Sequence, residues 1–244
     1  MKKKIYYYLR EERFDESTFI EKYADMYFES DESDESDENL PCPFPFLNKT
    51  TQDDENKILN LLEKDYKWTC EDVLNILVWK TGAKEYKYSD DEITLTPPGR
   101  EETNITNLAK KIVEEQADLR KKASECCFAE AYKSILDIVV ESEAKNIGTV
   151  YCITLLFFLS MGKIAIYDKQ AHKSLLAIKN CVLPGKSVGY LTPPDKTAKK
   201  KVAEMYDEFY QMLIELFPDY PDCDIPCKRN IDRALWVYGH YFEV

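Results

Sequence analysis

A single carboxylate inside a lysine-rich stretch is the feature of this sequence that most suggests chemistry. From Lys145 to Lys201 there are ten lysines, opposed only by Asp168 and Asp195, so the stretch has a net charge of +8. The whole chain has a net charge of −12, and the remaining residues therefore carry −20. Clustered lysines can neutralise phosphates, although solvated helix faces are also often rich in lysine, and both interpretations stay open.

A tight turn lies 20 residues before Asp168. The sequence Asn146-Ile147-Gly148 predicts a turn in which Gly148 takes the left-handed backbone conformation. Its exposed amides, together with the N-terminus of the next helix, can hold a phosphate. Residues 149–160 are uncharged and apolar on every side, so we expect this helix to run through the core. Gly162 ends it, and a short extended link leads to Asp168 at the start of another helix.

Several helices are needed to position these residues, and the apolar spacing predicts a mostly helical chain. Helices are expected over 15–28, 70–81, 124–142, 196–217 and 229–242. Weak alternation predicts one or two short strands in Tyr86–Leu95 and Ile5–Leu9. Because Pro97-Pro98-Gly99 is typical of a boundary, we expect an acidic α(+β) region over 1–99 and a helical domain over 100–244.

Composition excludes several classes of protein. Only 7 glycines are present, and neither a G-x-G-x-x-G nor a P-loop pattern occurs, which removes the usual nucleotide-binding signatures. The apolar run Val150–Met161 is about half of the ~20 residues that a membrane helix needs. The lysine-led N-terminus is followed by too short an apolar segment for a signal peptide. We therefore expect a cytoplasmic protein with no membrane partner.

The eight cysteines predict neither a disulfide scaffold nor a metal site. Cys126, Cys127 and Cys152 fall in apolar helical patterns, which predicts that they are small buried residues. Cys223 and Cys227 have a C-x3-C spacing, but no further ligands lie nearby to complete a zinc or iron–sulfur site. We expect reduced thiols, no metal and no cofactor.

An acidic tract, Glu29–Glu38, carries seven negative charges and predicts a flexible loop over 29–40. Its simplest role is solubility. The alternative is that it imitates nucleic acid and competes for the lysine-rich stretch.

The segment around Asp168 resembles the helix-hairpin-helix DNA glycosylase superfamily, particularly its 8-oxoguanine DNA glycosylase-like branch. In that family a hairpin P-G-[VI]-G-T precedes a buried helix, a G-[KR]-x-x-x-[PI]-x-D link and the catalytic aspartate. Here Asn146-Ile147-Gly148-Thr149 occupies the hairpin, Gly162-Lys163 ends the helix, and Asp168 has the catalytic position. The resemblance covers roughly residues 120–244. Two departures are that Asn146 replaces the first hairpin glycine and that Val150 stands where bifunctional members have their catalytic lysine.

The resemblance implies a mainly α fold: a helix-hairpin-helix glycosylase-like domain with a small N-terminal α(+β) part. It implies a monofunctional DNA glycosylase, acting as a monomer on double-stranded DNA, that flips out and excises a damaged or modified base. The setting would be base-excision repair or anti-phage defence. Asp168 would stabilise the oxocarbenium ion and activate water, without lyase chemistry. The alternative is that Asp168 is only a helix N-cap, within a non-catalytic DNA- or protein-binding helical module.

The resemblance also implies which other residues would contact DNA. The hairpin and the helix after Asp168 would bind the backbone through Lys145, Asn146, Ile147, Gly148, Thr149, Lys169, Gln170, His172 and Lys173. The run Lys199–Lys201 would neutralise further phosphates. An extruded base would stack in a pocket whose candidate walls are Trp79, Tyr132, Trp236, Tyr238 and His240. Each of these side chains is also typical of a hydrophobic core, and His172 of an ordinary surface or half-buried histidine.

Overall fold

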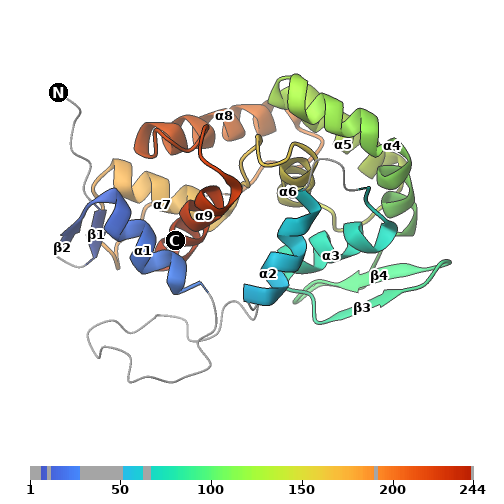
Figure 1. Cartoon of the computed structure of the whole chain (residues 1–244), viewed down its shortest axis with the longest axis horizontal. Helices are drawn as coiled ribbons and strands as arrows, with labels where there is room; N and C mark the ends of the chain where they lie inside the picture. The colour runs from blue at the N-terminus through green and yellow to red at the C-terminus, as the bar shows by residue number, and fades with distance from the viewer. Residues whose placement is uncertain (1–6, 10–11, 28–51, 63–66, 190–191, 243–244) are drawn as a thin grey trace. The chain divides into compact units, whose positions relative to one another are not determined.

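The chain divides into two compact units, and the fold is mainly helical, as predicted (Figure 1). The computed structural model describes residues 7–9, 12–27, 52–62, 67–189 and 192–242. Unit 1 contains residues 1–49, 167–192 and 206–244, and unit 2 contains residues 50–166 and 193–205. The expected boundary at residue 99 falls inside unit 2. The acidic tract, predicted as a loop over 29–40, lies outside the described residues.

Unit 2 contains most of the helical scaffold. Its elements are α2 (Gln52–Leu59), the short 3₁₀ helix η1 (Asn60–Leu62), α3 (Cys70–Thr81), β3 (Glu85–Tyr88), β4 (Ile93–Thr96), β5 (Thr103–Asn104), α4 (Thr106–Glu125), α5 (Phe128–Glu141), α6 (Thr149–Leu159) and the first residues of α8 (Lys199–Leu216). Helix α3 has the predicted bounds. Thr69 and Asp72 form a capping box at its start, and Gly82 ends it in the left-handed conformation with φ 64°.

The strands of unit 2 form a small antiparallel sheet with the order β3-β4-β5. The predicted extended segment Tyr86–Leu95 is a hairpin of two strands, in which Tyr86 pairs with Leu95. The Ser89 amide donates to the Glu92 carbonyl at 3.0 Å and closes the turn. The buried side chains of Ile93 and Leu95 face the core, and β4 contacts α3.

The predicted helix over 124–142 is two helices, because the chain turns at Cys126 and Cys127. Both cysteines have extended backbone conformations, and they separate the end of α4 from the start of α5. Both side chains are exposed, so the prediction that they are buried is wrong. A helical pattern cannot place residues that lie in the junction between two helices. Within α5, Tyr132 is buried, whereas Val140 is 53% exposed.

Helix α6 forms the centre of unit 2. Of its residues only Val150 and Tyr151, in the first turn, are less than fully buried, and Cys152 is buried as predicted. It contacts α3, α4 and α5. Because neighbouring helices cover α6 on every side, an unpaired charge on any of its faces would be desolvated, which explains why residues 149–160 carry no charge.

Unit 1 is built around helix α9 (Ile225–Gly239), which contacts both α1 (Glu16–Asp25) and α7 (Lys169–Lys179) (Figure 1). It also contains the two-stranded antiparallel sheet of β1 (Tyr7–Leu9) and β2 (Glu12–Phe14) and the later residues of α8. Its core is aromatic. The ring of Tyr238 lies 5.3 Å from Phe19 and 5.2 Å from Tyr23, centroid to centroid.

The starts of the last two helices differ from prediction for local reasons. Asp195 accepts hydrogen bonds from the Thr197 amide (2.9 Å) and hydroxyl (2.6 Å), which holds a turn before α8 begins at Lys199. Helix α9 begins earlier than expected because Asp224 caps the Cys227 amide at 2.9 Å and Pro226 follows the cap.

Candidate functional site

The turn between α5 and α6, residues 142–148 (hereafter the hairpin), has left-handed residues at Glu143 and Asn146 and not at Gly148, where one was predicted. Asn146 has φ 60°, whereas Gly148 is extended with φ −96° and ψ −175°. Asparagine is one of the residues that tolerates this conformation best, so it can replace glycine at the turn. The Asn146 amide nitrogen also donates to the Thr103 hydroxyl at 3.1 Å, and buried Ile147 anchors the hairpin in unit 2.

The N-terminus of α6 has no side-chain cap. Gly148 is the N-cap and provides no capping side chain, and a methyl group added to it would meet nothing within 4 Å. Within the described part of the chain, the amides of Thr149 and Val150 have no hydrogen-bond acceptor. The Thr149 hydroxyl instead donates to the Pro194 carbonyl at 2.6 Å. The backbone geometry therefore suits an anionic oxygen at this helix end.

Asp168 reaches the start of α7 through the link that follows α6. Met161 and Gly162 both have left-handed conformations (φ 54° and 76°), which ends α6. The Ser160 hydroxyl then accepts from the Ile164 amide at 2.9 Å. The link passes from unit 2 to unit 1 between residues 166 and 167. Asp168 is half-buried, and its carboxylate accepts from the Gln170 amide at 2.7 Å, so it is an N-cap.

Two of the predicted DNA contacts, His172 and Lys173, are buried inside unit 1. Nδ1 of His172 lies 3.2 Å from the Tyr167 hydroxyl, and its ring packs on Phe209. Burial lowers the pKa of His172 to about 4, which keeps the imidazole neutral. Nζ of Lys173 donates to the Phe242 carbonyl at 2.7 Å. Both side chains are therefore directed into the core of unit 1, and the prediction that they contact DNA does not agree with their burial. Lys169 and Gln170, in contrast, are half-buried.

The five aromatic candidates for a base pocket do not form one cluster. Trp79 and Tyr132 belong to unit 2, and the other three belong to unit 1. Tyr132 is buried and donates to the Lys196 carbonyl at 3.0 Å. Tyr238 is 1% exposed in the core of unit 1, so neither tyrosine lines a surface. Trp79 is half-buried and packs edge-on against Phe158.

Trp236 and His240 are the remaining pair, with ring centroids 4.4 Å apart and both side chains half-buried. His240 lies near the start of α7. Burial lowers its pKa to about 4, while the neighbouring Asp168 carboxylate acts in the opposite direction. A methyl group added to Gly239 would lie 2.2 Å from the Gln170 carbonyl oxygen, which shows how closely the two helices approach. Sequence reasoning missed Gly239, although a glycine within an apolar helical pattern was a usable signal.

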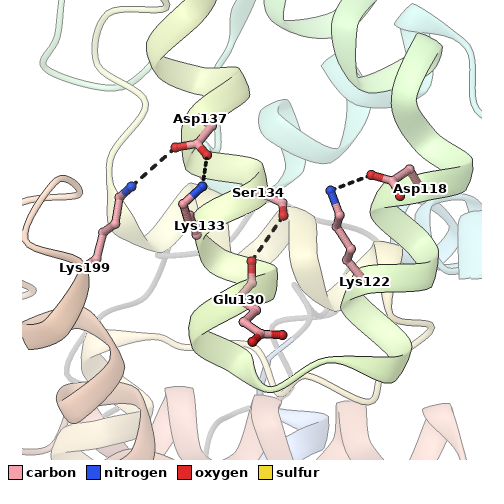
Figure 2. Close-up of polar contacts among 7 residues, drawn as sticks. All are labelled: Asp118, Lys122, Glu130, Lys133, Ser134, Asp137 and Lys199. Atoms are coloured by element: carbon pink, nitrogen blue, oxygen red, sulfur yellow. Dashed lines mark hydrogen bonds and ion pairs between the residues drawn. The ribbon is translucent and has the colours of Figure 1, made fainter.

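Some lysines of the basic stretch form ion pairs, and others are exposed. Lys179 pairs with Glu215, Lys200 with Glu204 and Lys199 with Asp137. Figure 2 shows Lys199 and Lys133 both pointing toward Asp137, at 3.4 and 2.7 Å. Lys145 is exposed. The positive charge of the stretch is thus partly balanced by acids from elsewhere in the chain.

Comparisons with protein-family models, with curated proteins and with solved structures give no match to this chain. Among the described residues, no helix has the length and apolar character needed to cross a membrane. Within the same ranges, no group of three or more histidine, cysteine, aspartate or glutamate side chains is arranged to hold a metal ion.

Proposed function

We propose that this protein is a monofunctional DNA glycosylase that excises a damaged or modified base, with Asp168 as its catalytic carboxylate. One observation carries the proposal. Asp168 is a half-buried carboxylate at the N-cap of α7, and its charge acts on the neighbouring His240 of the same unit. In unit 2, separately, the backbone amides at the start of α6 would hold a DNA phosphate.

The proposed reaction is hydrolysis of the N-glycosidic bond. The bond between C1′ and the base nitrogen breaks, and the base leaves with the bonding electrons and takes up a proton. Water oxygen forms the new bond to C1′ and gives its proton to Asp168 or to solvent. The ionised carboxylate stabilises the positive charge that develops on the sugar. Val150 has no amine to attack C1′, which supports hydrolysis without lyase chemistry.

The alternative is a DNA- or protein-binding module without catalysis. The capping bond favours it, because the Asp168 carboxylate already has a structural use. The two functions predict different effects when the Asp168 carboxylate is replaced by an amide of the same shape: a glycosylase would lose excision, whereas a binding module would keep its binding.

The test is the substitution Asp168→Asn. Asparagine caps helices about as well as aspartate, so the thermal midpoint should stay the same. The excision rate on a panel of modified-base duplexes, read as alkali-labile sites, should fall by about 10²–10⁴-fold, with DNA affinity within about twofold.

The matched control is Asp195→Asn, because Asp195 is the other acid of the basic stretch and caps its own turn through Thr197. That variant should excise normally. If wild-type protein leaves every duplex of the panel intact, or if Asp168→Asn excises at the wild-type rate, the glycosylase proposal is wrong.

A further inference from the structure

A surface formed by three separate segments of unit 2 is the starting point. These are α5, the hairpin and residues 193–201. The Thr149 hydroxyl binds the Pro194 carbonyl at 2.6 Å, and the Tyr132 hydroxyl binds the Lys196 carbonyl at 3.0 Å. These two bonds hold the start of α8 beside α5 and the hairpin. We call the side chains of Lys133, Lys145, Lys199, Lys200 and Lys201 on these segments the lysine surface.

Asp137 lies between two members of the lysine surface. Its Oδ2 is 2.7 Å from Nζ of Lys133, and its Oδ1 is 3.4 Å from Nζ of Lys199 (Figure 2). Lys133 and then Lys199 hold the pKa of Asp137 below its ordinary value, so the carboxylate is ionised. One carboxylate contacts two ammonium groups, which leaves a net charge of +1, and the side chains of Lys133 and Lys199 remain 62% and 45% exposed.

The three segments together carry six lysines and five acids, so their net charge is only +1. Lys200 pairs with Glu204 at 3.7 Å, with both side chains well exposed. Lys145 and Lys201 are exposed, and within the described residues neither has an acidic partner. Of the other acids on these segments, Glu141 pairs with Lys111 and Asp195 binds Thr197, whereas Glu130 and Glu143 are exposed. Exposed ion pairs of this kind are weak, so a polyanion can replace them.

We propose that the lysine surface binds the phosphate backbone of duplex DNA next to the hairpin, and that a phosphate takes the place of Asp137 between Lys133 and Lys199. A phosphodiester presents two anionic oxygens, as the Asp137 carboxylate does. Because these contacts involve the backbone only, they add affinity and position without reading sequence. The proposal rests on the proposed function for its partner, DNA. It adds that Asp137 lowers the affinity for that partner.

The test measures binding alone. The probe is a short fluorescent duplex with a tetrahydrofuran abasic-site analogue, which has no base to excise, titrated with the full-length protein over a series of potassium chloride concentrations. Asp137→Asn should tighten binding by about three- to tenfold at low salt, since it removes the competing charge. Lys201→Gln should weaken binding by a similar factor and reduce the slope of log affinity against log salt by about 1.

Asp118→Asn is the matched control. Asp118 forms an exposed ion pair with Lys122 at 2.6 Å on α4, so this substitution removes the same charge from the same unit without touching the lysine surface (Figure 2). It should change affinity by less than about twofold.

The outcomes separate this proposal from the glycosylase proposal. If Asp137→Asn and Asp118→Asn have equal effects, or if Lys201→Gln leaves the salt slope unchanged, the lysine surface is not a DNA site, even where excision is observed. If both variants behave as expected but no duplex is ever cleaved, the surface is a DNA site and the catalytic proposal fails. Absence of all DNA binding overturns both.

Discussion

At the scale of single residues, the structure distinguishes buried side chains from surface side chains where the sequence pattern does not. His172 and Lys173 directly follow the first turn of α7, and their types suggest contacts with DNA. Their partners, however, come from other places in the chain: Nζ of Lys173 binds the carbonyl of Phe242, 69 residues away. A buried lysine is stable only with such an acceptor, and its partner cannot be read from local spacing.

Burial of the two histidines predicts a pH dependence of stability. The pKa of His172 is lowered to about 4, and that of His240 likewise. Between the unfolded pKa of about 6.5 and the folded value, the unfolded chain binds protons that the folded chain does not. Stability is therefore full above about pH 6.5 and falls as the pH decreases through this window, by about 1–2 kcal/mol for each histidine at about pH 5.

The substitution His172→Phe removes one of these two titrations. The slope of the unfolding free energy against pH, measured by urea denaturation between about pH 7 and 5, should then be roughly half that of the wild type. Equal slopes for the two proteins would contradict the assignment of His172 as a neutral core residue.

At the scale of secondary-structure elements, the crossing of α7 and α9 fixes the surroundings of Asp168 within unit 1. The Ser174 hydroxyl donates to the Leu235 carbonyl, and Lys173 donates to the Phe242 carbonyl. Between these two bonds, Gly239 lets the backbones of the two helices approach closely. The α7 start that presents Asp168 is therefore held by α9.

Gly239→Ala should destabilise the protein by about 1–3 kcal/mol and lower the thermal midpoint by several degrees. The added methyl group would lie 2.2 Å from a backbone oxygen and 2.7 Å from a backbone carbon of Gln170, neither of which can rotate away. This clash outweighs the better helix propensity of alanine. Gly148→Ala is the control, because its methyl group meets nothing within 4 Å, and it should cost less than about 1 kcal/mol.

At the scale of the whole molecule, charge is distributed unevenly. The chain has a net charge of −12, while residues 145–201 carry +8. Screening by salt reduces the self-repulsion of an acidic protein but weakens its binding to a polyanion. Over one series of potassium chloride concentrations, the thermal midpoint should therefore rise while the affinity for duplex DNA falls. Affinity that is independent of salt would argue against phosphate contacts.

The sequence predicts much of the helical framework, because caps and apolar spacing are local. The bounds of α3 follow from Thr69 and Gly82, and the burial of α6 follows from its lack of charge. The turn at Cys126 and Cys127 could not be predicted in the same way, because no glycine or proline marks it. The division into two units is also hidden from local patterns, since each unit is assembled from separate stretches of chain.

The candidate site was predicted less completely than the helices. The position of Asp168 at a helix start was found, because aspartate favours that place. Because glycine is the usual left-handed residue, the sequence predicts that conformation at Gly148, whereas Glu143 and Asn146 adopt it. The bonds from Thr149 and Tyr132 to residues 194 and 196 join segments 45 and 64 positions apart, which spacing cannot reveal.

The capping bond of Asp168 has a consequence for how this protein could evolve. A single nucleotide change converts an aspartate codon to an asparagine codon, and asparagine would preserve the helix start. Natural selection for the stability of the fold alone would not remove such a mutation. Under the proposed function, a lineage could therefore change from a protein that excises a base to one that only binds DNA in one step, and could return by the reverse step.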